Sequence, residues 1–136
     1  MEFRHKVSCS TNKLVELRGF VKHTLHTIGI SDTMAYNLAL AVDEVCANVM
    51  IHSHQCDAHD FIELTIRKKE GYIVFEIVDK HELGYDIENH QSVPVSILIE
   101  DKRKGGLGLQ LVDKIMDRIE YFNLPPKHVY RLSKCI

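Results

Sequence analysis

The stretch FIELTIRKKEGYIVFEIVD, residues 61–79, decides the fold of this sequence. Its first half alternates polar residues with the apolar residues Ile62, Leu64 and Ile66. This alternation is typical of a strand with one buried face and one solvated face. A turn follows at Glu70-Gly71, and the second half is rich in aromatic and β-branched residues, which favour strands. The stretch therefore predicts an antiparallel hairpin that ends at Asp79.

Outward from this hairpin, three segments space their apolar residues as helices do. The first covers residues 14–28 and is ended by Gly29. The second is capped by Ser31-Asp32 and runs to about residue 52. The third follows residues 105–108, and its apolar face consists of Leu111, Val112, Ile115 and Ile119.

Strands are also predicted near both ends of the sequence, over residues 3–9 and 129–135. The order of elements is strand, two helices, two strands, a long loop, a helix and further strands. Grouped helices beside hairpins favour an α+β fold over a doubly wound parallel sheet. We expect a two-layer sandwich in which helices cover one face of a mostly antiparallel mixed sheet. The length of 136 residues fits a single domain over residues 1–136.

The composition is that of an ordinary globular protein, with 45% hydrophobic and 26% charged residues. Seventeen Lys and Arg residues against 19 Asp and Glu residues give a net charge of -2, which argues against direct nucleic-acid binding by bulk charge. There is no secretory signal and no stretch that could span a membrane, so we expect a cytoplasmic protein. Disulfides are rare in the cytosol, which predicts that all four cysteines are thiols.

The second predicted helix carries Glu44 and Asn48, which are four residues apart and therefore share one helix face. A carboxylate at this position is a candidate general base, and an amide oxygen is a candidate ligand for a hard cation. A solvated helix face is the ordinary alternative, because Glu and Asn are common at protein surfaces.

Asp79 ends a strongly apolar strand, so its carboxylate is expected to point into a crevice beyond the sheet. Gly84 follows closely, and a glycine allows the backbone to approach a flat ligand. An ordinary strand end followed by a turn glycine is the alternative.

The third candidate feature is Lys104-Gly105-Gly106-Leu107-Gly108-Leu109, at the start of a predicted helix. Free N–H groups and the helix dipole favour anions there, and Lys102, Arg103 and Lys104 add positive charge. The spacing matches neither a Rossmann nor a Walker motif. Ordinary loop chemistry is an equally good explanation of these glycines taken alone.

The joint pattern resembles the histidine-kinase-like (GHKL) ATPase superfamily, whose architecture is the Bergerat fold. Within that superfamily the chain is similar to the anti-sigma-factor serine/threonine kinases. The resemblance rests on Leu40 to Val49 followed by His52, on Gly105 to Val112, and on the closing hairpin from Ile119 to Lys134. It covers essentially the whole chain.

The resemblance implies a role for each candidate residue. Asn48 would bind Mg²⁺ at the phosphates of ATP, and Glu44 would orient or deprotonate the attacking hydroxyl. Asp79 would accept a hydrogen bond from the adenine amino group, and Gly84 would line the adenine pocket. The phosphates would be bound by the glycine-rich stretch: Lys104, Gly105, Gly106, Leu107, Gly108 and Leu109. Residues 87–104 would form a lid over the nucleotide.

The implied function is an ATP-dependent serine/threonine protein kinase that regulates transcription as an anti-sigma factor. It would phosphorylate a small antagonist (anti-anti-sigma) protein, sequester a sigma factor and form a homodimer. The segment after Asp79 departs from the family pattern Asp-x-Gly-x-Gly-x-Asp, because the first glycine is absent and one residue is inserted. This departure favours an alternative, a partner-binding module of the same fold without catalysis.

Histidines cluster after the second helix, where His52, His54, Cys56 and His59 lie close together in sequence. Such residues are able to ligate zinc, but their spacing matches no standard structural zinc pattern. A solvated, histidine-rich loop is therefore the expectation.

Overall fold

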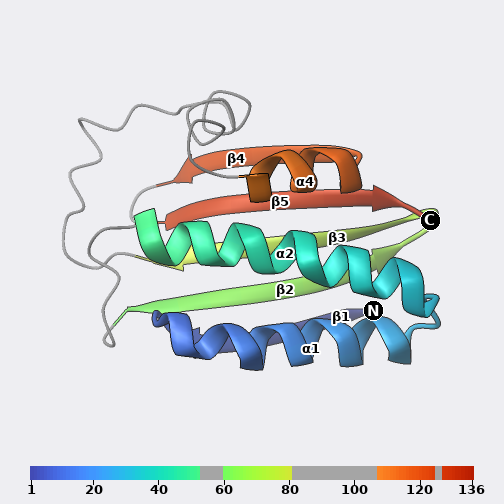
Figure 1. Cartoon of the computed structure of the whole chain (residues 1–136), viewed down its shortest axis with the longest axis horizontal. Coiled ribbons are helices and arrows are strands. Elements are labelled where there is room, and N and C mark those ends of the chain that lie inside the picture. The colour runs from blue at the N-terminus through green and yellow to red at the C-terminus, as the bar shows by residue number, and fades with distance from the viewer. Residues whose placement is uncertain (53–59, 81–106, 125–126) are drawn as a thin grey trace.

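The computed structural model describes residues 1–52, 60–80, 107–124 and 127–136. Its elements follow in chain order in Figure 1: β1 (Glu2–Ser8), the 3-10 helix η1 (Thr11–Lys13), α1 (Leu14–Thr27), α2 (Asp32–His52), β2 (Phe61–Lys69), β3 (Tyr72–Lys80), α4 (Leu107–Ile115), β4 (Arg118–Leu124) and β5 (Lys127–Cys135).

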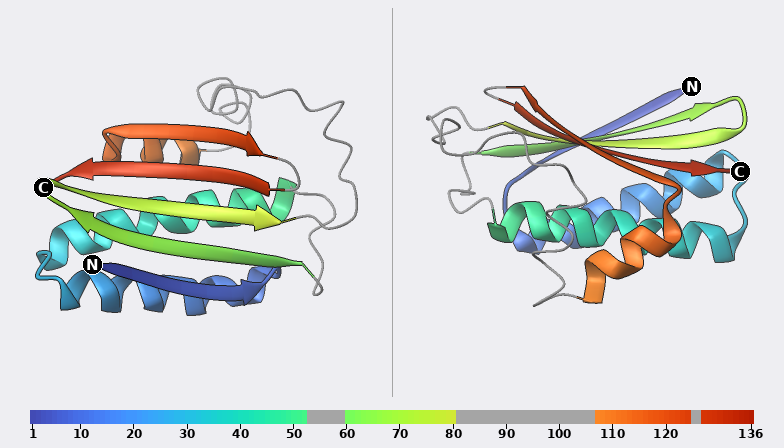
Figure 2. Two further views of the ribbon diagram at one scale, coloured as in Figure 1. Left: turned by 180° about the vertical axis from the view of Figure 1, so that it is seen from behind. Right: turned by 90° about the horizontal axis from the view of Figure 1, so that it is seen from above.

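The strands form one five-stranded sheet in the order β1-β2-β3-β5-β4. All four pairings between these described strands are antiparallel. Figure 2 shows α1, α2 and α4 together on one side of the sheet. The predicted α+β class, with helices on one face of the sheet, is confirmed.

The central hairpin forms as the sequence predicts. β2 and β3 pair in a register that places Ile66 opposite Phe75, and both side chains are fully buried against the helices. Gly71 adopts a φ of 85° in the connecting turn, a conformation that L side chains rarely adopt. The alternation of the sequence thus becomes a core face and an open face of the sheet.

The two long helices pack side by side over this core. α1 buries Leu17, Val21 and Leu25, and α2 begins with the predicted cap, since the Met34 N–H donates to Ser31 Oγ at 3.3 Å. None of the helices among the described residues is long and apolar enough to cross a membrane.

The third helix is shorter than predicted. α4 ends at Ile115, and Ile119 lies in β4 opposite Leu132, so its placement on the helix was wrong. The Met116 N–H still donates to Val112 O, but the Asp117 N–H donates to Ser133 O at 2.9 Å. Pairing with β5 therefore replaces the helical hydrogen bonds at this point.

The cysteines also differ from expectation. Cys46 is a free, buried thiol and Cys135 a free, exposed thiol, as predicted. Cys9, by contrast, is disulfide-bonded, so the prediction of four thiols was wrong. Compartment alone predicted the redox state, and sequence spacing gave no sign that Cys9 would be bonded.

Candidate functional site

Helix α2 holds Glu44 and Asn48 one turn apart. Both side chains are half-buried rather than fully solvated. The helix around them is largely apolar core, with Ala41, Val45 and Cys46 at 6% exposure or less. Partial burial on a helix of this kind is unlike the fully solvated face that was the ordinary alternative.

The amide of Asn48 has a defined orientation. Its Nδ2 donates to the backbone oxygen of Glu44 at 2.7 Å. The backbone oxygen of Glu44 only accepts hydrogen bonds, so the amide group that faces it must be the nitrogen of Asn48 and not the oxygen. This hydrogen bond therefore determines which way the Asn48 amide is turned. The amide oxygen, Asn48 Oδ1, has no hydrogen-bond partner among the described residues. Asn48 thus offers an oxygen of the kind that a hard divalent cation prefers, and the residue fits an Mg²⁺ ligand.

Asp79 lies near the end of β3 and is only 2% exposed. It has the same strand phase as Ile73, Phe75 and Ile77, whose side chains form part of the core beneath the helices. Its carboxylate is therefore on the helix-facing side of the sheet. Figure 1 shows this end of β3 at the same end of the molecule as the C-terminal half of α2.

His128 is a residue that the sequence did not single out. It lies opposite Asp79 in the β3–β5 register and is 5% exposed. Its Nδ1 is 2.7 Å from the hydroxyl of Tyr121, and the two rings are stacked. No motif marks this histidine, and only the strand register, which the sequence left open, would have placed it beside Asp79.

The first turn of α4 contains Leu107, Gly108 and Leu109. It includes no acidic residue, and the backbone N–H groups of a first helical turn have no partner within the helix. Helix α4 packs beside α2. In Figure 1 its first turn faces the end of the molecule at which β3 finishes, and the right-hand view of Figure 2 shows that this turn is the part of α4 farther from the sheet. An anion at this turn would experience the positive end of the helix dipole.

The remaining predicted positions lie outside the described residues. These are Gly84, Lys104, Gly105, Gly106 and the whole of the proposed lid at 87–104. Among the candidates, the described structure therefore brings Glu44 and Asn48 together directly. It places Asp79 and the start of α4 on elements that adjoin α2.

The histidine-rich segment also falls mostly outside the described residues. Within residues 1–52, 60–80, 107–124 and 127–136, no group of three or more His, Cys, Asp or Glu side chains is arranged to hold a metal ion. Three of the four residues of the histidine cluster, His54, Cys56 and His59, lie outside the described residues, so the solvated loop stays a prediction.

Known proteins resemble this chain along most of its length. The family model of the histidine kinase-like ATPase domain matches residues 7–134. The serine/threonine-protein kinase BtrW of Bordetella bronchiseptica is 28% identical over 91 residues, which cover 67% of this chain and 63% of BtrW. The serine-protein kinase RsbW of Bacillus subtilis is 25% identical over 118 residues, or 79% of this chain and 72% of RsbW. The chain thus spans less than two thirds of the length of BtrW.

Two solved structures share the fold. One contains the RsbU and RsbW domains of Rv1364c from Mycobacterium tuberculosis, with a TM-score of 0.70 and 12% identity. The match covers 99% of this chain and 32% of that one. The other is the SiaB–SiaC complex from Pseudomonas aeruginosa, with a TM-score of 0.62, 16% identity and coverage of 98% and 89%. At these identities the likeness concerns the fold alone.

Proposed function

The chain belongs to the histidine kinase-like ATPase family, and from that premise we propose that it is an ATP-dependent serine/threonine protein kinase acting as an anti-sigma factor. Membership of this family implies ATP binding. The kinase activity is supported by two relatives named as serine or serine/threonine kinases. The observation that carries the proposal is the half-buried pair on α2, with Asn48 Oδ1 available one turn from the Glu44 carboxylate.

In the proposed site, Glu44 accepts the proton of a Ser or Thr hydroxyl on the partner. The hydroxyl oxygen bonds to the γ-phosphorus, the bond from phosphorus to the β–γ bridging oxygen breaks, and ADP leaves with that oxygen. Asn48 Oδ1 would be the ligand from this chain to Mg²⁺, which when bound neutralises charge on the phosphates.

The other residues of the proposed site bind and orient ATP. Asp79 accepts a hydrogen bond from the amino group of adenine, and Gly84 lines the adenine pocket. The phosphates lie at the start of α4, where the N–H groups of Gly105, Gly106, Leu107, Gly108 and Leu109 donate to them, with Lys104 adding positive charge. Phosphoryl transfer needs mainly such positioning and charge stabilisation.

The proposed partners are proteins. One is a small antagonist that carries the phosphorylated hydroxyl, and the other is a sigma factor that the kinase holds in the cytoplasm. A relative in fold, SiaB, is found in complex with SiaC, which supports a protein partner for this fold. We further propose that the working form is a homodimer.

A second function is favoured by one observation on the sequence. The segment that follows Asp79 lacks the first glycine of the family pattern and contains an inserted residue. A chain with this change would keep the partner-binding surfaces of the fold while turning over little or no nucleotide. Such a protein would bind its partners without phosphorylating them.

Glu44→Gln separates the two functions, because it keeps the shape of the side chain and removes its basicity. We expect ATP affinity to be retained and phosphate transfer to the antagonist to fall by about 10²–10⁴-fold. Transfer is measured with radiolabelled ATP and a small antagonist protein of the proposed class. Glu70→Gln, at the exposed β2–β3 turn, is the matched control. Transfer at the wild-type rate in Glu44→Gln would remove Glu44 from catalysis, and absent transfer in the ATP-bound wild type would favour the binding module.

A further inference from the structure

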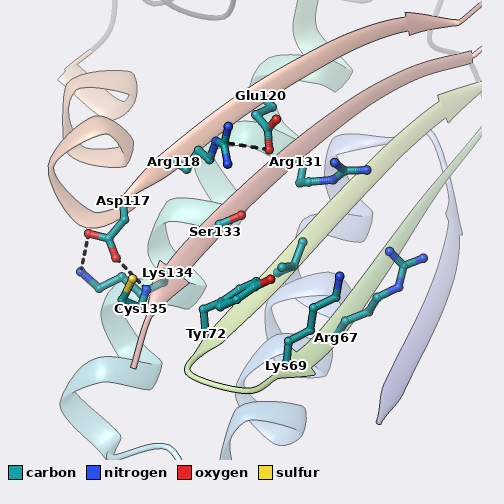
Figure 3. A pocket seen from close by; sticks show the side chains of 11 residues that line it. Arg67, Lys69, Tyr72, Asp117, Arg118, Glu120, Arg131, Ser133, Lys134 and Cys135 are labelled. Atoms are coloured by element: carbon teal, nitrogen blue, oxygen red, sulfur yellow. Dashed lines mark hydrogen bonds and ion pairs between the residues drawn. The ribbon is translucent and has the colours of Figure 1, made fainter.

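The face of the sheet opposite the helices contains a charged pocket that the proposed kinase site does not use. In the register across the sheet, Arg118, Ser133, Val74 and Arg67 occupy one row on this face. A cavity of about 560 Å³ lies over this row, and we call it the sheet pocket. Figure 3 shows the side chains that line it. None of the helices among the described residues covers this face (Figure 2).

The charge of the sheet pocket is opposite to that of the chain. Its lining includes five cations, Arg67, Lys69, Arg118, Arg131 and Lys134, against the carboxylates Asp117 and Glu120. Glu2 and Glu76 also pair with Arg67, so five cations stand against four carboxylates and an excess of one positive charge remains. The whole chain has a formal net charge of -2. A local excess of positive charge on an otherwise slightly acidic protein attracts an anionic ligand.

Two of these cations are held in place by one carboxylate of the neighbouring strand β3. The carboxylate of Glu76, which is only 8% exposed, bridges Arg67 Nη1 and Arg131 Nη2, the latter at 2.9 Å. Arg131 also lies over the ring of Phe122, 4.8 Å from its centroid. Arg67 Nη2 and Arg131 Nη1 remain without a partner among the described residues. The guanidinium groups are thus preorganised, with N–H donors left to bind a carboxylate.

The carboxylates of the pocket are already engaged. Asp117 Oδ2 accepts the Cys135 N–H at 2.6 Å, and its Oδ1 is 3.6 Å from Lys134 Nζ. These contacts, the backbone hydrogen bond first, hold the pKa of Asp117 below its usual value, so it stays ionised and paired. Glu120 lies 3.8 Å from Arg118. Lys69 has no ion pair among the described residues and is free to meet a ligand.

We propose that the sheet pocket is a docking site for an acidic segment of a partner protein. Its cations line the pocket from β2, β4 and β5, which suits an extended chain with several carboxylates better than a single small anion. Tyr72 and Val74 add apolar surface for the rest of such a segment. A nucleic acid fits less well, because nucleic-acid sites typically lie on domains with a net positive charge and this chain has a formal net charge of -2.

Fluorescence anisotropy with a fluorescein-labelled, glutamate-rich peptide tests this proposal. We expect binding that weakens as salt is added, and no binding of the same peptide with Gln in place of each Glu. Lys69→Glu and Arg118→Glu should each weaken binding by about tenfold, since each replaces an attraction by a repulsion. Lys22→Glu makes the same charge change on an exposed position of α1 and should leave the affinity unchanged.

Four results would overturn the proposal. The peptide fails to bind, or it binds the charge-reversed variants as tightly as the wild type. Displacement of the peptide by inorganic phosphate more effectively than by chloride, at matched ionic strength, would identify a small-anion site. A change of oligomeric state in Lys69→Glu, measured by light scattering while peptide affinity stays constant, would assign this face of the sheet to a second copy of the chain. ATP affinity, measured in the same variants, keeps this test separate from the kinase proposal.

Discussion

At the scale of single residues, the proposed site depends on how Asn48 is oriented. The sequence predicted that Glu44 and Asn48 share a helix face, because that follows from the spacing of four residues. It could not predict the hydrogen bond from Asn48 Nδ2 to the Glu44 carbonyl, which depends on the rotamer of the side chain. That bond directs the amide oxygen away from the helix backbone.

Asn48→Ala tests this orientation. The variant removes the proposed cation ligand, and we expect ATP affinity to lose its dependence on Mg²⁺ while the fold is kept. Calorimetric titration of ATP with and without Mg²⁺ measures the effect. Asn37→Ala, an exposed asparagine on the same helix, is the control and should behave as the wild type. If Asn48→Ala retains the full effect of Mg²⁺, Asn48 is not a metal ligand.

The two free thiols in the described part of the chain differ strongly in environment. Burial, and then the nearby charge of Asp43, raise the pKa of Cys46 to about 12, whereas Cys135 is exposed. At about pH 8, roughly one in ten thousand Cys46 side chains is ionised to the thiolate, and the sulfur is also inaccessible to reagents. Iodoacetamide should therefore alkylate Cys135 and spare Cys46 until the chain is unfolded. Mass spectrometry of the digested protein reads both sites, and equally rapid labelling of Cys46 in the native protein would contradict its burial.

At the scale of elements, the sheet is held on its open face by charged side chains. Glu76 on β3 links Arg67 on β2 to Arg131 on β5, and Glu2 on β1 extends the chain of contacts to Arg67 at 2.7 Å. The hairpin alternation predicted which residues of β2 would be polar. It did not predict these partners, because the sequence left the pairing of β3 with β5 open.

Glu76→Gln tests the contribution of this network. We expect a loss of about 1–3 kcal/mol in the free energy of unfolding, because two arginines lose a buried ionic acceptor. Urea unfolding followed by circular dichroism measures the change. Glu63→Gln is the control, since Glu63 shares this face of the sheet but has no ion pair among the described residues. Equal losses in both variants would show that the network adds nothing to stability.

The length of an element was harder to predict than its existence. The apolar spacing that continues to Ile119 extended the third helix too far, because the same residue also suits a strand. The choice between helix and strand depends on a residue distant in sequence, because the backbone oxygen of Ser133 accepts the Asp117 N–H. A single sequence does not contain that choice in its local pattern.

At the scale of the whole molecule, the order of elements predicted the two-layer α+β fold. It did so because a hairpin with one apolar face needs a helical layer to bury that face. The strand order β1-β2-β3-β5-β4 was not predicted, and it is this order that places His128 opposite Asp79. The sequence therefore predicted the candidate residues, which lie in local motifs. It could not predict their spatial neighbours, such as His128, because these depend on the strand order.

The recognition of adenine is the claim on which the account depends most, because Asp79 is followed by the segment that departs from the family pattern. The most direct measurement is calorimetric competition of ATP, GTP and inorganic triphosphate for the wild-type protein in the presence of Mg²⁺. A buried carboxylate accepts a hydrogen bond from the amino group of adenine and is repelled by the carbonyl of guanine, so ATP should bind at least about tenfold more tightly than GTP. Asp79→Ala should lose most of this preference. Equal binding of ATP, GTP and triphosphate by the wild type would contradict the adenine site.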